Sequence, residues 1–399
     1  MSTAHPGHRT RARSRSDADR WEERVQTTAH PVAYRMLRAV SARGPVVRVP
    51  RVGVVVSDAG LARAVLTDTE RFTKTGPGSP SDLWTPILGP SVLLNMEGSE
   101  HAALRRRLGG LFTPGYVAAL CERVLREPLT ELTSALAAGE DVDLVAAVQR
   151  CAGAAICELV GLPPDPKRFT TAFAEASAVT SMVRLWRSSL TPRQVGTARA
   201  VLGRLTAAAT DAYRFGDETT VPGRMRALGL SEEETRGAVG AFLLTGTETL
   251  VSFLPRLVAL CHDTGRLDRL RADPSGTDAV VEEALRVTVP SPVMLRSVAA
   301  PATVGGTPVS PGDRVVVFTL RCARAHGPFD PDRPMPPELR RLWFGAGPHF
   351  CLGMPLAMEQ IRSVLAAVLA AGPVRVTDRR IARRVLIPGY ARLTLRRSA

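Results

Sequence analysis

One cysteine stands in a setting that could hold a metal ion. Between Phe344 and Gly353 the chain reads Phe-Gly-Ala-Gly-Pro-His-Phe-Cys-Leu-Gly, so Cys351 follows two glycines and a proline. Such a tight loop can point backbone N–H groups at one sulfur. The helix that we expect over 352–371 adds the positive end of its dipole, which lowers a thiol pKa. A thiolate held in this way is a good soft metal ligand.

Two other roles for Cys351 stay open. An isolated cysteine is usually a buried structural residue, although the glycine spacing argues against that here. A catalytic nucleophile would need an oriented base beside it. His349 is near in sequence, but no orienting Asn or Asp is evident.

A long apolar helix is predicted over about 232–261. Ser231 and Glu234 fit a capping box, which fixes its start. Its middle reads Leu-Thr-Gly-Thr-Glu-Thr-Leu, so a glycine and four polar side chains interrupt the apolar run. Because glycine costs roughly 1 kcal/mol inside a helix, we expect Gly246 to leave room for a small ligand. The Glu248 carboxylate beside a threonine hydroxyl could relay protons.

Two structural interpretations compete with this catalytic one. A membrane span has about the right length and apolarity, but Glu248, Pro255 and Arg256 lie within the stretch and argue against it. A buried core helix with hydrogen-bonded threonines is the stronger alternative. Against it, an unpaired carboxylate is costly to bury.

Two pairs of charged residues have helical spacing. Glu283 and Arg286 lie three residues apart, on one helix face, where a solvated surface pair is the usual explanation. His101 and Arg105 lie four residues apart. They form either a basic surface or two donors aimed at an anionic group.

The composition restricts the class of protein that must position these residues. The 399 residues include 45% hydrophobic and 23% charged residues, which is typical of a globular chain. The net charge of +14 comes from arginines spread along the chain, since only Lys74 and Lys167 are lysines, and aromatic residues make up 5%. We therefore expect no nucleic-acid partner. The six cysteines show no zinc spacing and the N-terminus has no apolar leader, which predicts free thiols, no membrane anchor and a cytoplasmic location.

The distribution of apolar residues predicts a mainly α protein with small β-sheets in one domain. Residues 1–20 read as a disordered basic tail, and residues 21–399 as the single domain. A long Gly-, Pro- and Ser-rich loop is expected over 72–95, and helices dominate 101–286. Strands are expected over 46–49, 53–56 and 314–319, and Asp58 is expected to cap a short helix. Residues 302–309 are expected to carry a Gly-Gly turn, and a final hairpin is expected to turn at 387–390.

The chemical segments together resemble a known family. Phe344-x-x-Gly347-x-x-x-Cys351-x-Gly353 is similar to the haem-thiolate signature of the cytochrome P450 family. The Thr-Gly-Thr-Glu-Thr run resembles its oxygen-activation helix, and Glu283-x-x-Arg286 its paired motif. Their order also agrees, over roughly Trp21 to the C-terminus. The resemblance implies a helix-rich triangular prism with haem b between the long central helix and the cysteine loop.

The same resemblance implies roles for single residues. Cys351 is the expected axial ligand of the haem iron, and Thr249 and Glu248 are the expected alcohol and acid of proton delivery. Glu283, Arg286 and Arg333 match a structural triad, although Pro334 replaces the usual aromatic residue after it. The residues expected to bind or surround the cofactor are His101, Arg105, Arg296, Phe344, His349, Gly353 and Gly246.

A substrate pocket is a further expectation from the resemblance. Thr245 stands where the family usually has alanine or glycine, so it would narrow the space above the haem. Core packing is an equally good account of any single apolar residue of the pocket. The residues expected to line it are Trp84, Trp186, Ala241, Thr245, Val293, Met294 and Tyr390.

The resemblance implies a haem-thiolate monooxygenase of the bacterial kind. It would use dioxygen and NAD(P)H-derived electrons, passed on by a ferredoxin reductase and a ferredoxin that docks on the basic face near Cys351. Its substrate would be a largely hydrophobic small molecule, oxidised in specialised-metabolite biosynthesis such as that of antibiotics. Three alternatives remain: a haem protein without oxygenase activity, an enzyme of oxidative coupling or rearrangement, and a cysteine hydrolase.

Overall fold

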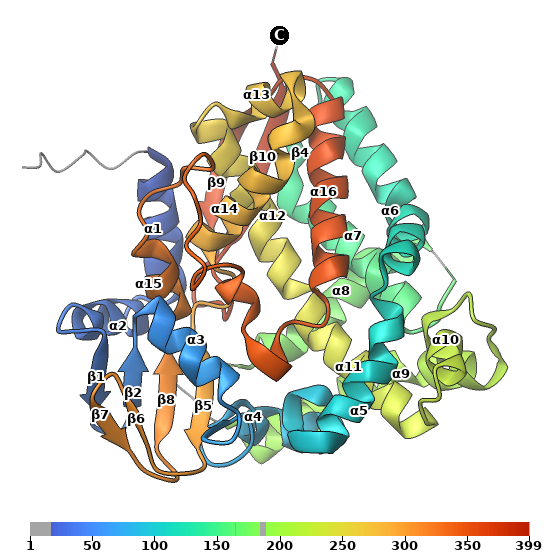
Figure 1. Ribbon diagram of the computed structural model, residues 1–399. Helices are drawn as coiled ribbons and strands as arrows, with labels where there is room; N and C mark the ends of the chain where they lie inside the picture. The colour runs from blue at the N-terminus through green and yellow to red at the C-terminus, as the bar shows by residue number, and fades with distance from the viewer. Residues whose placement is uncertain (1–16, 164, 184–188, 399) are drawn as a thin grey trace, which may run out of the picture.

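The computed structural model describes residues 17–163, 165–183 and 189–398, and helices make up most of it (Figure 1). This confirms the prediction of a mainly α fold with small sheets. The α-helices are α1 (Asp17–Ala29), α2 (Ala33–Ser41), α3 (Ala59–Thr67), α4 (Pro80–Leu88), α5 (Gly98–Leu108), α6 (Pro114–Ala137), α7 (Leu144–Leu159), α8 (Pro166–Thr180), α9 (Pro192–Phe215), α10 (Val221–Ala227), α11 (Glu232–Gly246), α12 (Glu248–Asp263), α13 (Arg266–Ala272), α14 (Thr277–Thr288), α15 (Thr319–Arg324) and α16 (Met354–Ala370).

The strands form three small sheets, of which the five-stranded sheet and the β6–β7 hairpin lie at the lower left of Figure 1, while the three-stranded sheet lies among the helices. The five-stranded sheet has the order β1-β2-β8-β5-β3, the three-stranded sheet the order β4-β10-β9, and β6 and β7 form a hairpin. The predicted turn at Gly305–Gly306 joins this hairpin, since both glycines have positive φ. The strands are β1 (Val46–Val49), β2 (Gly53–Val56), β3 (Phe72–Thr73), β4 (Val142–Asp143), β5 (Met294–Val298), β6 (Ala302–Val304), β7 (Thr307–Val309), β8 (Arg314–Val317), β9 (Val374–Ile381) and β10 (Tyr390–Arg397).

The long apolar stretch lies in the centre of the molecule as two helices, α11 and α12 (Figure 1). Ser231 and Glu234 form the predicted capping box at the start of α11. By length and apolarity the stretch could cross a membrane. It is instead surrounded by protein, because α12 packs against α1, α7, α14 and α16. The stretch therefore lies within the protein rather than across a membrane, and it breaks at Thr247, which the sequence did not predict.

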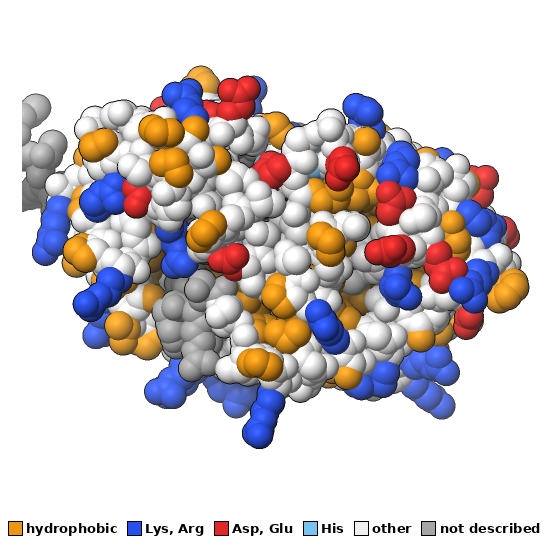
Figure 2. All heavy atoms as spheres, turned by 90° about the horizontal axis from the view of Figure 1, so that it is seen from below, with side chains coloured by type: hydrophobic (Ala, Val, Ile, Leu, Met, Phe, Trp, Pro, Cys, Tyr) orange, Lys and Arg blue, Asp and Glu red, His pale blue; other side chains and the backbone are white. Residues whose placement is uncertain are grey.

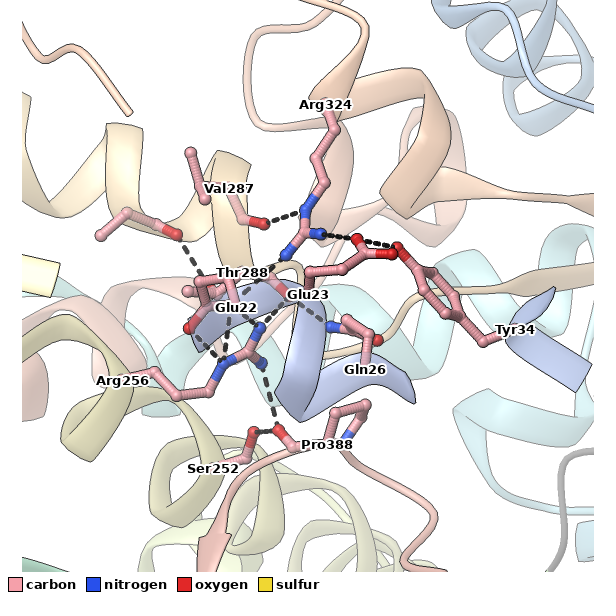
Figure 3. A network of polar contacts seen from close by, with 11 residues as sticks. Glu22, Glu23, Gln26, Tyr34, Ser252, Arg256, Val287, Thr288, Arg324 and Pro388 are labelled. Carbon is pink, nitrogen blue, oxygen red and sulfur yellow. Dashed lines mark hydrogen bonds and ion pairs between the residues drawn. The ribbon is translucent and has the colours of Figure 1, made fainter. Parts of the chain in front are cut away.

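A buried ion pair joins α1 to α12 (Figure 3). The Arg256 side chain is fully buried and pairs with Glu22, which is 2% exposed. Arg256 also donates to the carbonyl oxygens of Thr288 at 2.8 Å and Pro388 at 3.1 Å. One guanidinium on the central helix thus fixes α1, the end of α14 and the turn before β10.

Two local predictions need correction. Residues 17–20 belong to α1, because Asp17 and Asp19 in its first turn suit the positive end of the helix dipole; residues 1–16 lie outside the described residues. The predicted loop over 72–95 contains β3 and α4. Pro80 occupies the first turn of α4, where its missing N–H is harmless, and Asp82 accepts from the Gly78 N–H at 2.6 Å.

Candidate active site

The cysteine loop is closed by its own backbone. The Cys351 N–H donates to the Phe344 carbonyl at 2.8 Å. Gly347 has φ +64°, and a Cβ there would lie 2.9 Å from the Thr67 Cα on α3, so only glycine fits. Gly353 is the N-cap of α16. The loop therefore presents Cys351 at the start of a helix, as predicted.

The environment of the Cys351 thiol combines opposing effects. Burial raises its pKa, while the backbone N–H groups of Gly353 and Met354 and the Arg105 charge lower it. The net direction is upward, so the expectation of a lowered pKa is wrong for the metal-free thiol. Cys351 is nevertheless the exposed one among the six cysteines. A metal ion that reaches this sulfur would displace the proton, because a coordinating thiol is deprotonated.

The predicted basic residues gather beside the cysteine loop. His101 on α5 is buried, and its ring centroid lies 4.3 Å from that of His349. Arg105, one turn further along α5, donates to the Phe350 carbonyl at 2.6 Å. Both are therefore aimed at the loop, and the interpretation as a basic surface is wrong.

Arg296 approaches the same region from β5. Its side chain is 4% exposed, and its guanidinium donates to the backbone carbonyl of the preceding residue, Leu295, at 2.9 Å. Burial lowers its pKa to about 10. Its Nε has no hydrogen-bond partner among the described residues. A buried guanidinium with an unused donor indicates a site for an anionic ligand.

A carboxylate that the sequence analysis missed lies among these cations. Glu97 Oε2 pairs with His349 Nε2 at 2.5 Å, and Oε1 accepts from the Thr73 hydroxyl at 3.0 Å and from the Lys74 N–H. Burial opposes its ionisation, but these hydrogen bonds lower its pKa to about 2. The His101 pKa falls to about 4, because the ring is buried near other cations. Glu97 and His349 are 252 residues apart, so no local signal could have paired them.

Three threonines at the break between α11 and α12 donate their hydroxyl hydrogens to the helix backbone. Thr245, Thr247 and Thr249 each donate to the carbonyl four residues earlier, at 2.8, 3.0 and 3.3 Å. Thr245 and Gly246 are exposed, although Leu244 before them is buried. A Cβ on Gly246 would meet nothing within 4 Å. This face of the central helix therefore borders open space, as predicted for Gly246.

Glu248 is anchored on the other side of this break. Its Oε1 accepts from Thr180 at 3.1 Å and from Ser177, both on α8. The carboxylate is thus bound to hydroxyl groups, which suits an acid that exchanges protons. Ser177 and Thr180 had not been identified from the sequence.

Aromatic rings connect the cysteine loop with the central helix. The Phe112 ring stacks edge-on against Phe242 of α11, with centroids 5.6 Å apart. The same ring lies 3.8 Å from where a Cβ on Gly353 would be. On the loop, Phe344 packs against Phe350 at 6.2 Å. The fold therefore brings together the two segments on which the predicted chemistry depends.

The Glu283–Arg286 pair is buried and joins α14 to the segment that follows α15. Both side chains are buried and joined by two hydrogen bonds of 2.6 Å, so the surface interpretation is wrong. Arg286 also donates to the carbonyls of Ala323 and Gly327. In the described part of the chain, Arg333 donates to Asp330 rather than to the pair, and the Asp330 N–H donates to Glu283.

The predicted pocket residues divide into three groups. Ala241 and Thr245 lie on α11, with Trp84 on α4, which packs against α11. Met294 is the first residue of β5, two residues before Arg296, and Val293 directly precedes it. Trp186 lies outside the described residues. Figure 2 shows apolar side chains around hollows on the face that is lowest in Figure 1, where α4 lies.

Tyr390, the remaining predicted pocket residue, lies in a buried polar network. It is 5% exposed and lies beside Arg379, Glu22 and Arg256. Burial is the main cause that raises its pKa. Its contacts place it in the buried network of α1, α12 and β9, so they give no support to a pocket role.

The comparisons with known proteins agree with this geometry. The family model described as Cytochrome P450 matches residues 275–378. The cytochrome P-450 monooxygenase DoxA of Streptomyces peucetius subsp. caesius is 30% identical, with 83% of this chain and 85% of DoxA covered. The erythromycin C-12 hydroxylase of Saccharopolyspora erythraea is 28% identical, over 77% of this chain and 79% of the hydroxylase. The structure of a P450 EryK mutant in complex with erythromycin B has a TM-score of 0.78 at 26% identity, covering 93% of this chain and 98% of that one.

Proposed function

Since the chain belongs to the cytochrome P450 family and to its monooxygenases, we propose that it oxidises a largely hydrophobic small molecule in specialised-metabolite biosynthesis. The erythromycin C-12 hydroxylase among the relatives, and the EryK structure with erythromycin B, support this substrate class. Family membership implies haem and dioxygen. The observation that carries the proposal is Cys351, set at the start of α16 and connected through Phe112 with α11, the helix that ends at the break.

The donor set fits haem. Cys351 would hold the iron, and His101, Arg105, Arg296 and His349 would hold the propionates, with the unpaired Arg296 Nε as one donor. Open space at Gly246 leaves room for a flat group next to α11. When bound, a haem with a thiolate ligand supplies dioxygen activation and favours cleavage of the O–O bond.

The chain's own residues would control protons at this site. Thr249 lies on the exposed side of the break, and its hydroxyl donates to the Thr245 carbonyl at 3.3 Å. At this distance the hydrogen bond is weak, so the hydroxyl can readily change to another partner. Glu248, held by α8 hydroxyls, is the acid next to it. We assign Thr249 to hold, through its hydroxyl, the group that donates a proton at the site. We assign Glu248 to supply a new proton to that group after each transfer.

Electrons would arrive from a ferredoxin, itself reduced by a ferredoxin reductase. Arg63 on α3 donates to the carbonyls of Glu338 and Arg340, and α3 also contacts the cysteine loop at Gly347. Arg106 and Arg340 are exposed near this loop. An acidic electron carrier would be steered to such a basic surface in a salt-dependent way. We place the protein in the cytoplasm, with its redox partners.

The first test is the absorption spectrum of the purified protein after reduction and exposure to carbon monoxide. A strongly red-shifted Soret band supports ligation by the Cys351 thiolate. The Cys351→His variant should retain haem but lose that shift. A histidine-like or haem-free spectrum of the unaltered protein contradicts the proposal.

The substrate is tested separately. Erythromycin B, the ligand named in the EryK structure, is the first probe and should perturb the Soret band on binding. Product formation that needs NADPH, dioxygen, ferredoxin and reductase distinguishes an oxygenase from a haem protein without this activity. Incorporation of labelled oxygen distinguishes hydroxylation from oxidative coupling or rearrangement.

A further inference from the structure

We propose that Lys74 binds a haem propionate, alongside the four basic residues that the family resemblance assigns. The proposal rests on haem binding in the site described above. Nothing in the sequence motifs identifies Lys74. It is, however, one of only two lysines in the chain, and the other residues of the Lys and Arg total are arginines.

The Lys74 backbone is fixed at the cysteine loop. Its N–H donates to Glu97 Oε1, and the Thr73 hydroxyl donates to the same oxygen. The other oxygen of Glu97 binds His349, two residues before Cys351. Further along, a Cβ on Gly76 would lie 3.2 Å from the Ser297 Oγ, so this segment also packs on β5 beside Arg296.

The Lys74 side chain lacks a partner. Across the described residues, no hydrogen bond or ion pair reaches its ammonium group. Burial and the nearby Arg296 lower its pKa to about 8. Arg296 Nε is unpaired in the same place. A half-buried ammonium without an acceptor beside a buried guanidinium with an unused Nε donor indicates an anionic ligand that touches both.

The net charge of the side chains around Lys74 matches the two negative charges of the haem propionates. Lys74, Arg105 and Arg296 contribute three positive charges, and Glu97 contributes one negative charge. Both Glu97 oxygens are already occupied by hydrogen bonds. Two positive charges remain uncompensated, and haem b has two propionate carboxylates. Binding would therefore neutralise the cluster, with Lys74 supplying one charge-assisted hydrogen bond.

The test uses the haem-loaded protein and two readouts other than activity. The first is the rate of haem transfer to excess haem-free myoglobin. The second is the resonance Raman band of propionate bending, which responds to hydrogen bonds at the carboxylate. The variants are Lys74→Met, Lys74→Arg and the control Lys167→Met, since Lys167 lies on α8 at the N-terminal end.

We expect Lys74→Met to lose haem on the order of ten-fold faster and to shift the propionate band. Lys74→Arg should shift the band but keep the rate within about two-fold, because it retains the charge. If Lys74→Met cannot be produced as folded protein, the propionate band of Lys74→Arg tests the proposal instead. Lys167→Met should change neither readout.

An unchanged propionate band in the Lys74 variants overturns the proposal, even if haem is lost faster, because that result indicates general destabilisation. An unchanged rate in Lys74→Met overturns it as well. If the unaltered protein shows no thiolate-type spectrum, the proposed function itself has failed. A normal spectrum with insensitive Lys74 variants refutes only the role of Lys74.

Discussion

The Glu248 carboxylate accepts a hydrogen bond from the Thr180 hydroxyl at 3.1 Å, which ties the acid of the central helix to the last residue of α8. Ser177, one turn earlier, donates to the same oxygen. The position of the carboxylate therefore depends on α8 as well as on α12. Proton delivery should respond to changes in a helix that carries none of the predicted catalytic residues.

Thr180→Val should disturb proton delivery without affecting haem. The substitution removes one hydroxyl from Glu248 and leaves the volume nearly unchanged. We expect the fraction of NADPH electrons recovered in product to fall about two- to five-fold. The control is Thr171→Val, an exposed residue of the same helix. Equal coupling in both variants would show that α8 does not position Glu248.

Thr249→Ala should divert electrons to hydrogen peroxide. The hydroxyl that holds the proton donor is lost, while the carbon monoxide spectrum should stay unchanged because no cofactor-binding residue is altered. Peroxide formed per NADPH should rise on the order of ten-fold, within the usual range for a lost proton-transfer group. Thr264→Ala is the matched control, since Thr264 also donates to a carbonyl four residues earlier, at 2.7 Å. An unchanged peroxide yield in Thr249→Ala refutes its assignment.

Gly347→Ala should prevent the cysteine loop from closing on α3. The residue has φ +64°, and the added Cβ would come within 2.9 Å of the Thr67 Cα, which cannot move aside as a side chain could. We expect the haem-loaded fraction, measured from the reduced carbon monoxide spectrum, to fall several-fold. Gly203→Ala on α9 meets nothing within 4 Å and should raise the unfolding free energy by about 1 kcal/mol.

Glu22→Gln should destabilise the fold strongly. It leaves the fully buried Arg256 without its charge partner, and we expect the free energy of unfolding to fall by about 3 kcal/mol. Glu122→Gln breaks an ion pair whose side chains are 74% and 72% exposed, and it should cost less than about 1 kcal/mol. Denaturant unfolding measures both. A similar small loss in the two variants would show that the buried pair is dispensable.

Acid should weaken the contribution of Asp263 to stability. Burial opposes ionisation of this carboxyl, but hydrogen bonds from Arg379 and His262 give it a net lowered pKa. Because the folded pKa lies below the unfolded value of about 3.9, the stabilisation is complete above that value and is lost as the pH falls through the folded pKa. The unfolding free energies of the unaltered protein and Asp263→Asn should therefore differ most near pH 6. Their difference should shrink below about pH 4; a constant difference would contradict this.

Much of the fold could be predicted because its signals are local. The strands over 46–49 and 53–56 and the Gly305–Gly306 turn depend on neighbouring residues, and the structure confirms them. The Ser231–Glu234 capping box is likewise a local device. The loop before Cys351 is specified by its glycines, since Gly347 needs a positive φ. The predicted loop over 72–95 was wrong at α4, where the start depends on Pro80 and Asp82 rather than on apolar periodicity.

The sequence by itself determined which residues could do chemistry: Cys351 in its glycine loop, Glu248 and Thr249 in an apolar helix, and the basic pair on α5. Only the tertiary structure decided their partners. Glu97 meets His349 across 252 residues, and Ser177 meets Glu248 across 71. It also moved Tyr390 into the buried network of α1. The physical reason is that hydrogen bonds and desolvation depend on distance in space, and the chain brings these groups together only when the core packs.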